Sequence, residues 1–218
     1  MGGNDIELYI KPLIFTLMKK VKIFYFILFF FTSCDNDHGN YSFKYNGITY
    51  EIVKDRKSWA DATKYAVEHG AKLAEIRSVG EQNAIYYALT HDAGVSPEYT
   101  HVKDGGDIAY VWIGATDKKQ EGTWTWTTTN SGNGDHFWNG QGYNGKGDGA
   151  AFNNAFINWG GTWNYKCMEP DNYMGSQNAG AVALSDWPKD KGTLGHAGEW
   201  NDINESNHLY FVIQYGNK

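Results

Sequence analysis

The sequence predicts an α+β fold, in which two helices pack on small antiparallel sheets and a long ordered loop region lies between the later strands. Three observations support this prediction. Alternating apolar residues mark strands near both ends of the domain. Two helical patterns follow the first of these strands, and a glycine-rich segment at residues 127–166 interrupts the second half of the chain.

The first elements are a β-hairpin and a helix. Residues 41–53 alternate around Asn46 and Gly47, and an Asn-Gly dipeptide is typical of a two-residue hairpin turn. Apolar residues then recur at helical spacing over residues 57–70, where Gly70 suits the C-cap of the helix. The domain is therefore expected to open with a hairpin followed by an amphipathic helix.

A second helix and five further strands complete the predicted elements. Ser78 lies three residues before Glu81, which is the spacing of a capping box, so we expect a helix from here to residue 89. The strands are expected at residues 71–76, 109–115, 122–129, 179–185 and 208–215.

Residues 127–166 are the least regular part of the domain. Their content of glycine, asparagine and threonine is also typical of a disordered linker. Their aromatic residues favour instead a long ordered loop that is packed by its own side chains. These residues include Phe137, Trp138, Tyr143, Phe152, Phe156, Trp159 and Trp163.

The size and composition fit a single domain with a sizeable core. The chain has 218 residues, of which 41% are hydrophobic and 16% aromatic. It contains 26 glycines but only 4 prolines. This mixture favours a loop-rich domain held together by aromatic residues.

Residues 1–34 have the pattern of an export segment. A basic start at Lys19 and Lys20 precedes an apolar run at residues 23–31, which is too short to span a bilayer but suits a signal sequence. Met18 is the natural start of this pattern, so residues 1–17 are interpreted as an over-long gene start.

The export segment ends in FTSC, which resembles a bacterial lipobox. Cys34 would then be lipidated, residues 35–40 would form a tether, and a domain at residues 41–218 would be held at a bacterial membrane. The outer membrane or cell surface is the expected location. An ordinary cleaved signal and an anchor helix are the alternatives.

Charge and cysteine content narrow the function. The net charge is −6, and removal of residues 1–34 takes away four lysines and two acidic residues, so the remaining chain carries −8. A nucleic-acid partner is not expected, because such partners require basic patches. Cys167 is the only cysteine besides Cys34, and no local base indicates a catalytic role for its thiol.

Two segments gather oxygen-bearing side chains. In MEPDN, Glu169 and Asp171 flank Pro170 at a spacing where their charges repel each other, and a bound cation would explain this arrangement. In GEWNDIN, Asn201 and Asp202 add further oxygen ligands. The sequence therefore raises the hypothesis that the two segments meet around one ion.

Together with VWIGATD at residues 111–117, these segments resemble the WIGL, EPN and WND motifs of the C-type lectin-like domain. The order of the motifs and the preceding pair of helices are also similar. The resemblance extends over residues 41–215 and is strongest to bacterial members of the family. It implies that the first and last strands of the domain pair, and that a long loop region covers residues 127–178.

The resemblance also implies a Ca²⁺ site, since calcium takes six to eight oxygen ligands. The proline of the EPN motif is cis in the family, and a cis bond before Pro170 would turn both flanking side chains toward one point. Matched motif by motif, the implied ligands are Glu169, Asp171, Gln177, Asn201 and Asp202.

Carbohydrate binding is implied at the same place. Sugar hydroxyls would complete the calcium shell and form hydrogen bonds with Glu169, Asp171 and Asn201. Trp187 would either stack on a sugar ring or anchor its loop by packing. Mannose-type members carry EPN and galactose-type members QPD, so the EPD of this chain identifies neither sugar.

A second ion is implied by the positions of Asp117, Glu121 and Asn172, which match those of an auxiliary calcium in some members. The alternative for these residues is a solvated polar turn.

We therefore expect a calcium-dependent module for glycan or glycoprotein binding, displayed at a surface and suited to adhesion. The alternative is a lectin-like fold that binds a protein or a surface without sugar recognition. An enzyme is not expected, because a glycosidase needs two carboxyl groups across a cleft, and Glu169 and Asp171 would both be committed to the ion. The sequence indicates no oligomeric state.

Overall fold

The computed structural model describes residues 39–126, 134–161 and 167–216. Residues Asp37–Lys218 cluster as one compact unit. The predicted export segment with Cys34 lies outside the described residues, as does most of the expected tether. Within the described ranges, no helix is both long enough and apolar enough to cross a membrane.

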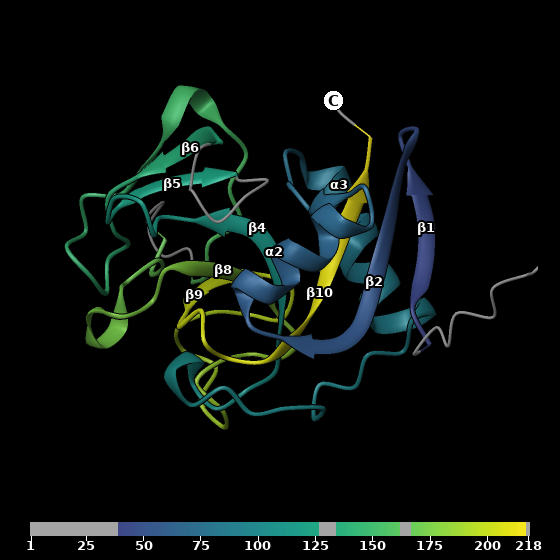
Figure 1. The fold of residues 1–218 in the computed structure, drawn as a ribbon. Helices are drawn as coiled ribbons and strands as arrows, with labels where there is room; N and C mark the ends of the chain where they lie inside the picture. The colour runs from purple at the N-terminus through teal and green to yellow at the C-terminus, as the bar shows by residue number, and fades with distance from the viewer. Residues whose placement is uncertain (1–38, 127–133, 162–166, 217–218) are drawn as a thin grey trace, which may run out of the picture. The chain divides into compact units, whose positions relative to one another are not determined.

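The domain opens with the expected hairpin. Strand β1 (Tyr41–Tyr45) pairs antiparallel with β2 (Ile48–Lys57). The turn between them has positive φ at Asn46 (47°) and Gly47 (79°), a conformation that asparagine and glycine adopt with least strain. The last strand, β10 (Leu209–Tyr215), pairs antiparallel with β2, so the two ends of the domain meet in the sheet (Figure 1).

The described strands form one ten-stranded sheet, in which the main order is β1-β2-β10-β4-β5-β6-β7. The short β3 also pairs with β10, β8 pairs with β4, and β9 pairs with β8. The remaining strands are β3 (Lys72–Leu73), β4 (Tyr110–Thr116), β5 (Thr123–Trp126), β6 (Asp135–Asn139), β7 (Ala150–Ala151), β8 (Ala179–Ala183) and β9 (Trp200–Ile203).

The prediction of an α+β fold with two helices is confirmed. The expected small antiparallel sheets are joined into one larger sheet, which includes one parallel pair of strands. All ten described strands belong to one sheet, and β10 and β4 pair in parallel. The chain between β4 and β10 forms β5 to β9 and their connecting loops, and it then returns beside β4 in the same direction. The local sequence pattern of a strand carries no information about its direction relative to a strand that is distant in the sequence.

Two helices cover opposite faces of the central strands. Helix α2 (Trp59–Glu68) is capped by Ser58, and α3 (Val79–Tyr87) is capped by Ser78, whose Oγ accepts from the Glu81 N–H at 3.2 Å. After α3 the chain continues in a π-helical turn, Ala88–Asp92.

The central strands β4 and β10 are buried on both faces. In β4, Trp112 packs into the core that contains Trp59 of α2, whereas Val111 packs into the core that contains Ile85 of α3. Successive residues of a strand point to opposite faces. The continuous burial of β4 therefore follows from its place between two hydrophobic cores.

The long loop region contains more regular structure than expected, because β6 and β7 lie inside it. Several of its aromatic residues are packed as the sequence indicates, whereas Tyr143 and Phe152 are exposed and Trp163 lies outside the described residues. Phe137 stacks on Trp126 with ring centroids 4.4 Å apart, and Trp159 meets Trp200 edge to face at 5.8 Å. These rings form an aromatic cluster behind β9, the strand that carries Asn201 and Asp202.

This packing predicts that Phe137→Ala lowers the free energy of unfolding by about 3–5 kcal/mol, since a large cavity would open in the aromatic cluster. Urea unfolding followed by tryptophan fluorescence measures the change. Phe152→Ala is the matched control: Phe152 is 38% exposed, so it should cost less than about 1 kcal/mol. Equal, small losses in both variants would contradict the assigned core.

Candidate functional site

The two oxygen-rich segments meet in the structure. Carboxylate oxygens of Glu169, Asp171 and Asp202 all lie within 4.8 Å of one another. Glu169 and Asp171 come from the loop before β8, and Asp202 comes from β9. The Glu169–Pro170 peptide bond is cis, as the resemblance implies. The sequence hypothesis that both segments contribute to one site is therefore supported by their placement.

Asp202 fastens the loop to the sheet. Its side chain is 1% exposed and accepts two backbone hydrogen bonds, from the N–H of Asp171 at 3.0 Å and from the N–H of Asn172 at 2.7 Å. One carboxylate thus fixes the backbone immediately after the proline, and with it the position of the Asp171 side chain.

Glu169 and Asn201 each have one occupied and one unoccupied polar atom. Glu169 Oε1 accepts from Trp187 Nε1 at 3.3 Å, and Asn201 Nδ2 donates to Tyr110 Oη at 3.0 Å. Among the described residues, neither Glu169 Oε2 nor Asn201 Oδ1 has a hydrogen-bond partner, although both are buried. A buried acceptor without a partner is costly, and a cation bound there would satisfy both oxygens.

Burial is the largest cause of raised pKa values at all three carboxyl groups, and neighbouring charges add to it at Glu169 and Asp202. Burial, followed by the charges of Asp202 and Asp171, raises the pKa of Glu169 well above its ordinary value. Burial and the charge of Asp171 raise the pKa of Asp202 in the same way, and burial raises the pKa of Asp171. A divalent cation would offset both causes, because it pairs with the charged form of each group. The donor set therefore fits calcium.

Gln177 is the candidate ligand whose side chain is already engaged. Its Oε1 accepts from the Tyr173 N–H at 2.7 Å, and its Nε2 donates to the Asp104 carbonyl at 2.9 Å. It is 1% exposed and lines the same pocket as Glu169 and Asp171. Gln177 thus lies at the site, and its two side-chain hydrogen bonds also hold the loop at residues 172–177 in place.

A pocket of about 250 Å³ gives access to the candidate ligands. Glu169, Asp171, Gln177 and Asn201 all line it. Tyr173 also lines the pocket and is 54% exposed, so it is a candidate contact residue that sequence reasoning missed. The signal was present, since an aromatic residue two positions after Asp171 in a polar loop has no core to fill.

The structure decides between the two roles considered for Trp187. Its side chain is 1% exposed and its ring meets that of Tyr110 edge to face at 5.9 Å. A ring enclosed in this way presents no free face to a sugar, so the stacking role is wrong and the packing role is correct.

The residues considered for an auxiliary ion are dispersed among other partners. Asp117 is 2% exposed; its Oδ2 accepts from the Gly122 N–H at 2.8 Å, and burial raises the pKa of this carboxyl to about 7. Glu121 accepts from Gln141 at 2.9 Å, and Asn172 accepts from the Gln177 N–H at 3.1 Å. The acidic cluster found in the described part of the chain does not include Asp117 or Glu121. The auxiliary site stays a prediction.

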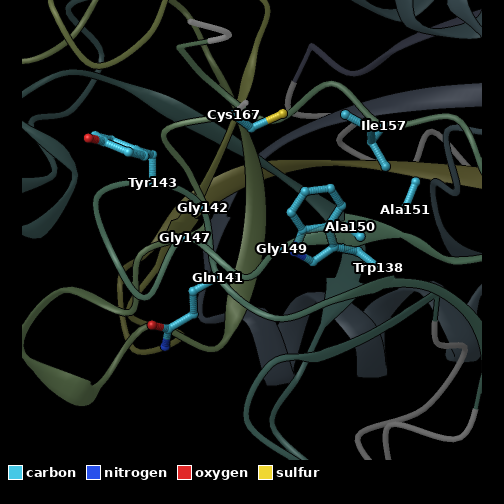
Figure 2. Close-up of a pocket in the computed structure, with 10 residues that line it drawn as sticks. All are labelled: Trp138, Gln141, Gly142, Tyr143, Gly147, Gly149, Ala150, Ala151, Ile157 and Cys167. Atoms are coloured by element: carbon cyan, nitrogen blue, oxygen red, sulfur yellow. The ribbon is translucent and has the colours of Figure 1, made fainter. Parts of the chain in front are cut away.

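Figure 2 shows a second pocket, which has a volume of about 360 Å³. Trp138, Ile157 and Cys167 are among its lining residues, together with several glycines. The lining residues that the structure describes include no charged side chain. The acidic side chains of Glu169 and Asp171, which could bind an ion, line the smaller pocket instead. Cys167 is 8% exposed, so its thiol is buried.

Comparison with known proteins establishes the family. The model of the lectin C-type domain matches residues 55–212, a range that contains every candidate ligand. The chain therefore belongs to the C-type lectin domain family. Members of this family generally bind carbohydrates and typically bind Ca²⁺, although some members lack sugar binding.

Individual relatives are distant. The rat (Rattus norvegicus) C-type lectin domain family 4 member F is 33% identical over 80 residues, which are 37% of this chain and 12% of that protein. The C-type lectin CEL-I from Cucumaria echinata is 18% identical, with a TM-score of 0.50 over 83% of this chain and 96% of that chain. The carbohydrate-recognition domain of cow CD23, solved in the presence of a GlcNAc2Man3 oligosaccharide, is 15% identical, with a TM-score of 0.50 over 81% and 94%. These structures share the fold.

The raised pKa values predict how the calcium-free chain responds to pH. Because the folded chain holds protons on Glu169, Asp171 and Asp202 that the unfolded chain releases, stability falls as pH rises. The loss starts near the ordinary carboxyl pKa of about 4 and continues up to the raised values. In Glu169→Gln, which keeps an oxygen for the Trp187 N–H, the loss should be smaller. Urea unfolding in EDTA at several pH values measures the difference, and parallel curves would contradict the assignment.

Proposed function

We propose that this chain is a calcium-dependent carbohydrate-binding module. The observation that carries the proposal is the pair of buried oxygens without partners, Glu169 Oε2 and Asn201 Oδ1, beside a cluster of three carboxylates. Most buried polar atoms in folded proteins have a hydrogen-bond partner, so two unpartnered oxygens beside one acidic cluster point to a missing ligand. Membership of the C-type lectin domain family supports the same function.

Four residues would hold the ion directly. Glu169, Asp171, Asn201 and Asp202 offer carboxylate and amide oxygens, which are the ligands that calcium prefers in proteins. Gln177 would complete the set if its carbonyl oxygen used its second lone pair, since the first is taken by the Tyr173 N–H. When bound, the ion would supply open coordination positions for two sugar hydroxyl oxygens.

Hydrogen bonds from the side chains around the ion would then determine which sugar hydroxyl groups bind. Glu169 and Asp171 accept hydrogen bonds from hydroxyl groups, whereas the Asn201 amide group can also donate one. Tyr173, at the rim of the pocket, would offer its exposed ring to the apolar face of a sugar. This combination of acceptors, donors and an aromatic surface suits a neutral glycan, and the EPD motif leaves the choice of sugar open.

A second candidate function is the binding of a protein surface without sugar. One observation favours it: Met174, next to Tyr173 on the same loop, is 83% exposed. Exposed methionine and tyrosine side chains side by side are typical of protein interfaces. Competition by simple sugars separates the two functions, because a sugar that displaces the bound partner must occupy the calcium pocket.

We further propose that the module is anchored at a bacterial surface through lipidated Cys34. The support comes from the sequence alone, in which a basic start, an apolar run and FTSC precede the domain. An anchor of this kind would present many copies side by side, and a weak lectin would gain avidity from such clustering.

Calcium should stabilise the purified chain against heat. A ligand that binds only the folded state adds about 2.7 kcal/mol to the free energy of unfolding at one hundred times its Kd, which corresponds to a shift of several degrees. Melting with calcium and with EDTA measures the shift. In Asp202→Asn the shift should disappear, while Asp92→Asn, at an exposed carboxylate outside the pocket, should keep it. A chain that melts at one temperature in both buffers would refute the calcium site.

Tyr173→Ala should weaken glycan binding on a calcium-loaded glycan array by about ten-fold, because one aromatic contact contributes up to about 1.5 kcal/mol. The same variant should keep the calcium shift in melting temperature, since its side chain supplies no ion ligand. Tyr87→Ala is the matched control: Tyr87 is 56% exposed and does not line the pocket. If both variants bind glycans equally well, the rim has no part in recognition.

A further inference from the structure

We infer that Tyr110 and Trp187 are positioning residues for the candidate calcium site. Tyr110 holds the amide nitrogen of Asn201, and Trp187 holds one carboxylate oxygen of Glu169. In each ligand side chain, the remaining oxygen is then available to an ion. The inference rests on the proposed calcium dependence and extends it to two aromatic residues that do not touch the ion themselves.

Tyr110 determines the orientation of the Asn201 amide. A tyrosine hydroxyl has a single proton, and Tyr110 donates it to the Gly105 carbonyl at 2.7 Å. Toward Asn201, at 3.0 Å, the hydroxyl oxygen is therefore left only as an acceptor. The amide must present its NH₂ group to Tyr110, and its Oδ1 is turned away, buried and without a partner among the described residues.

Trp187 acts on Glu169 by a similar rule. The indole Nε1–H can only donate, and it donates to Glu169 Oε1 at 3.3 Å. Oε1 is thereby held on the protein side of the carboxylate, and Oε2 is the oxygen left over. Since Glu169 is 2% exposed, water does not compete for these positions freely.

The two positioning rings support each other. Tyr110 and Trp187 are 0% and 1% exposed, and their rings meet edge to face at 5.9 Å with an interplanar angle of 68°. The Trp187 ring occupies a notch bordered by Gly160 and Gly195, where a Cβ on either glycine would overlap the indole. Neither ring has room to turn, so the hydrogen bonds start from fixed points.

The consequence is a pre-oriented pair of ligand oxygens. Without Tyr110 the Asn201 amide could rotate and present NH₂ to the ion, and without Trp187 the Glu169 carboxylate could rotate about its last bond. Partners that orient metal ligands in this way typically contribute 10- to 100-fold in metal affinity. We therefore expect both residues to act on calcium affinity through Asn201 and Glu169.

The test is calorimetric titration of the full chain with calcium chloride. Tyr110→Phe and Trp187→Phe keep an aromatic ring and lose the hydrogen bond, and each should raise the calcium Kd by about ten-fold. The matched controls lose hydrogen bonds of the same kind elsewhere: Tyr50→Phe loses the bond to Glu81, and Trp59→Phe loses the bond to the Ile113 carbonyl. The controls should keep the wild-type Kd, although they also lower the melting temperature in EDTA.

A second arm separates positioning from general loosening of the fold. In an Asn201→Asp background both terminal atoms are oxygens, so the orientation of the group no longer matters. Tyr110→Phe should therefore change the Kd by less than about two-fold in that background, against about ten-fold in the wild-type background. A merely structural role for Tyr110 would give the same loss in both backgrounds.

The outcomes are distinct. If the wild-type chain binds calcium and both phenylalanine variants bind it equally well, the positioning inference is wrong while the proposed function stands. Equal losses in the variants and in their controls would also overturn it. If the wild-type chain shows no heat of calcium binding, the proposed function and the inference fail together.

Discussion

Three carboxylates that repel one another in a buried place are the constraint on which the site depends. Glu169, Asp171 and Asp202 lie within 4.8 Å of one another, and two of them are almost fully buried. Hydrogen bonds from the protein offset only part of the free-energy cost of burying these charges. Backbone N–H groups reach both oxygens of Asp202, and an indole N–H reaches one oxygen of Glu169. The oxygens that stay without a partner suit a ligand that is positively charged and that several oxygen atoms can coordinate.

The hydrophobic core holds β9 in place, and β9 carries two of the candidate ligands. Trp200 precedes the two β9 ligands and is fully buried; its Nε1 donates to Gln82 of α3 at 2.7 Å, and Gln82 in turn donates to the Gly198 carbonyl. A helix thus holds the strand at its start, and the aromatic cluster supports it from behind. Ligands placed on a strand with such support keep their geometry without the ion, which lowers the cost of binding it.

The sequence predicted local features well and long-range ones poorly. Asn46-Gly47 and Ser78 specify a turn and a helix start through their own backbone chemistry, so these elements were predictable one at a time. The parallel pairing of β4 with β10 depends on how a long excursion returns, which no local pattern encodes. In the site, resemblance supplied the ligands. The hydrogen bonds from Asn201 to Tyr110 and from Trp187 to Glu169 could not be predicted from the sequence, because the paired residues lie 91 and 18 positions apart.

In the proposed function, ion binding and ligand choice would depend on physically different parts of the site. The oxygens for the ion would come from buried and partly buried residues that are held by the sheet and by two enclosed rings. The surface offered to a partner comes from the loop that follows, where Tyr173 is 54% and Met174 is 83% exposed and where Asn172 and Met174 have positive φ. On the proposed function, a change in an exposed side chain of this loop would alter which partner fits and leave the buried carboxylates in place. One ion site could then serve sugar or protein recognition, according to the exposed loop.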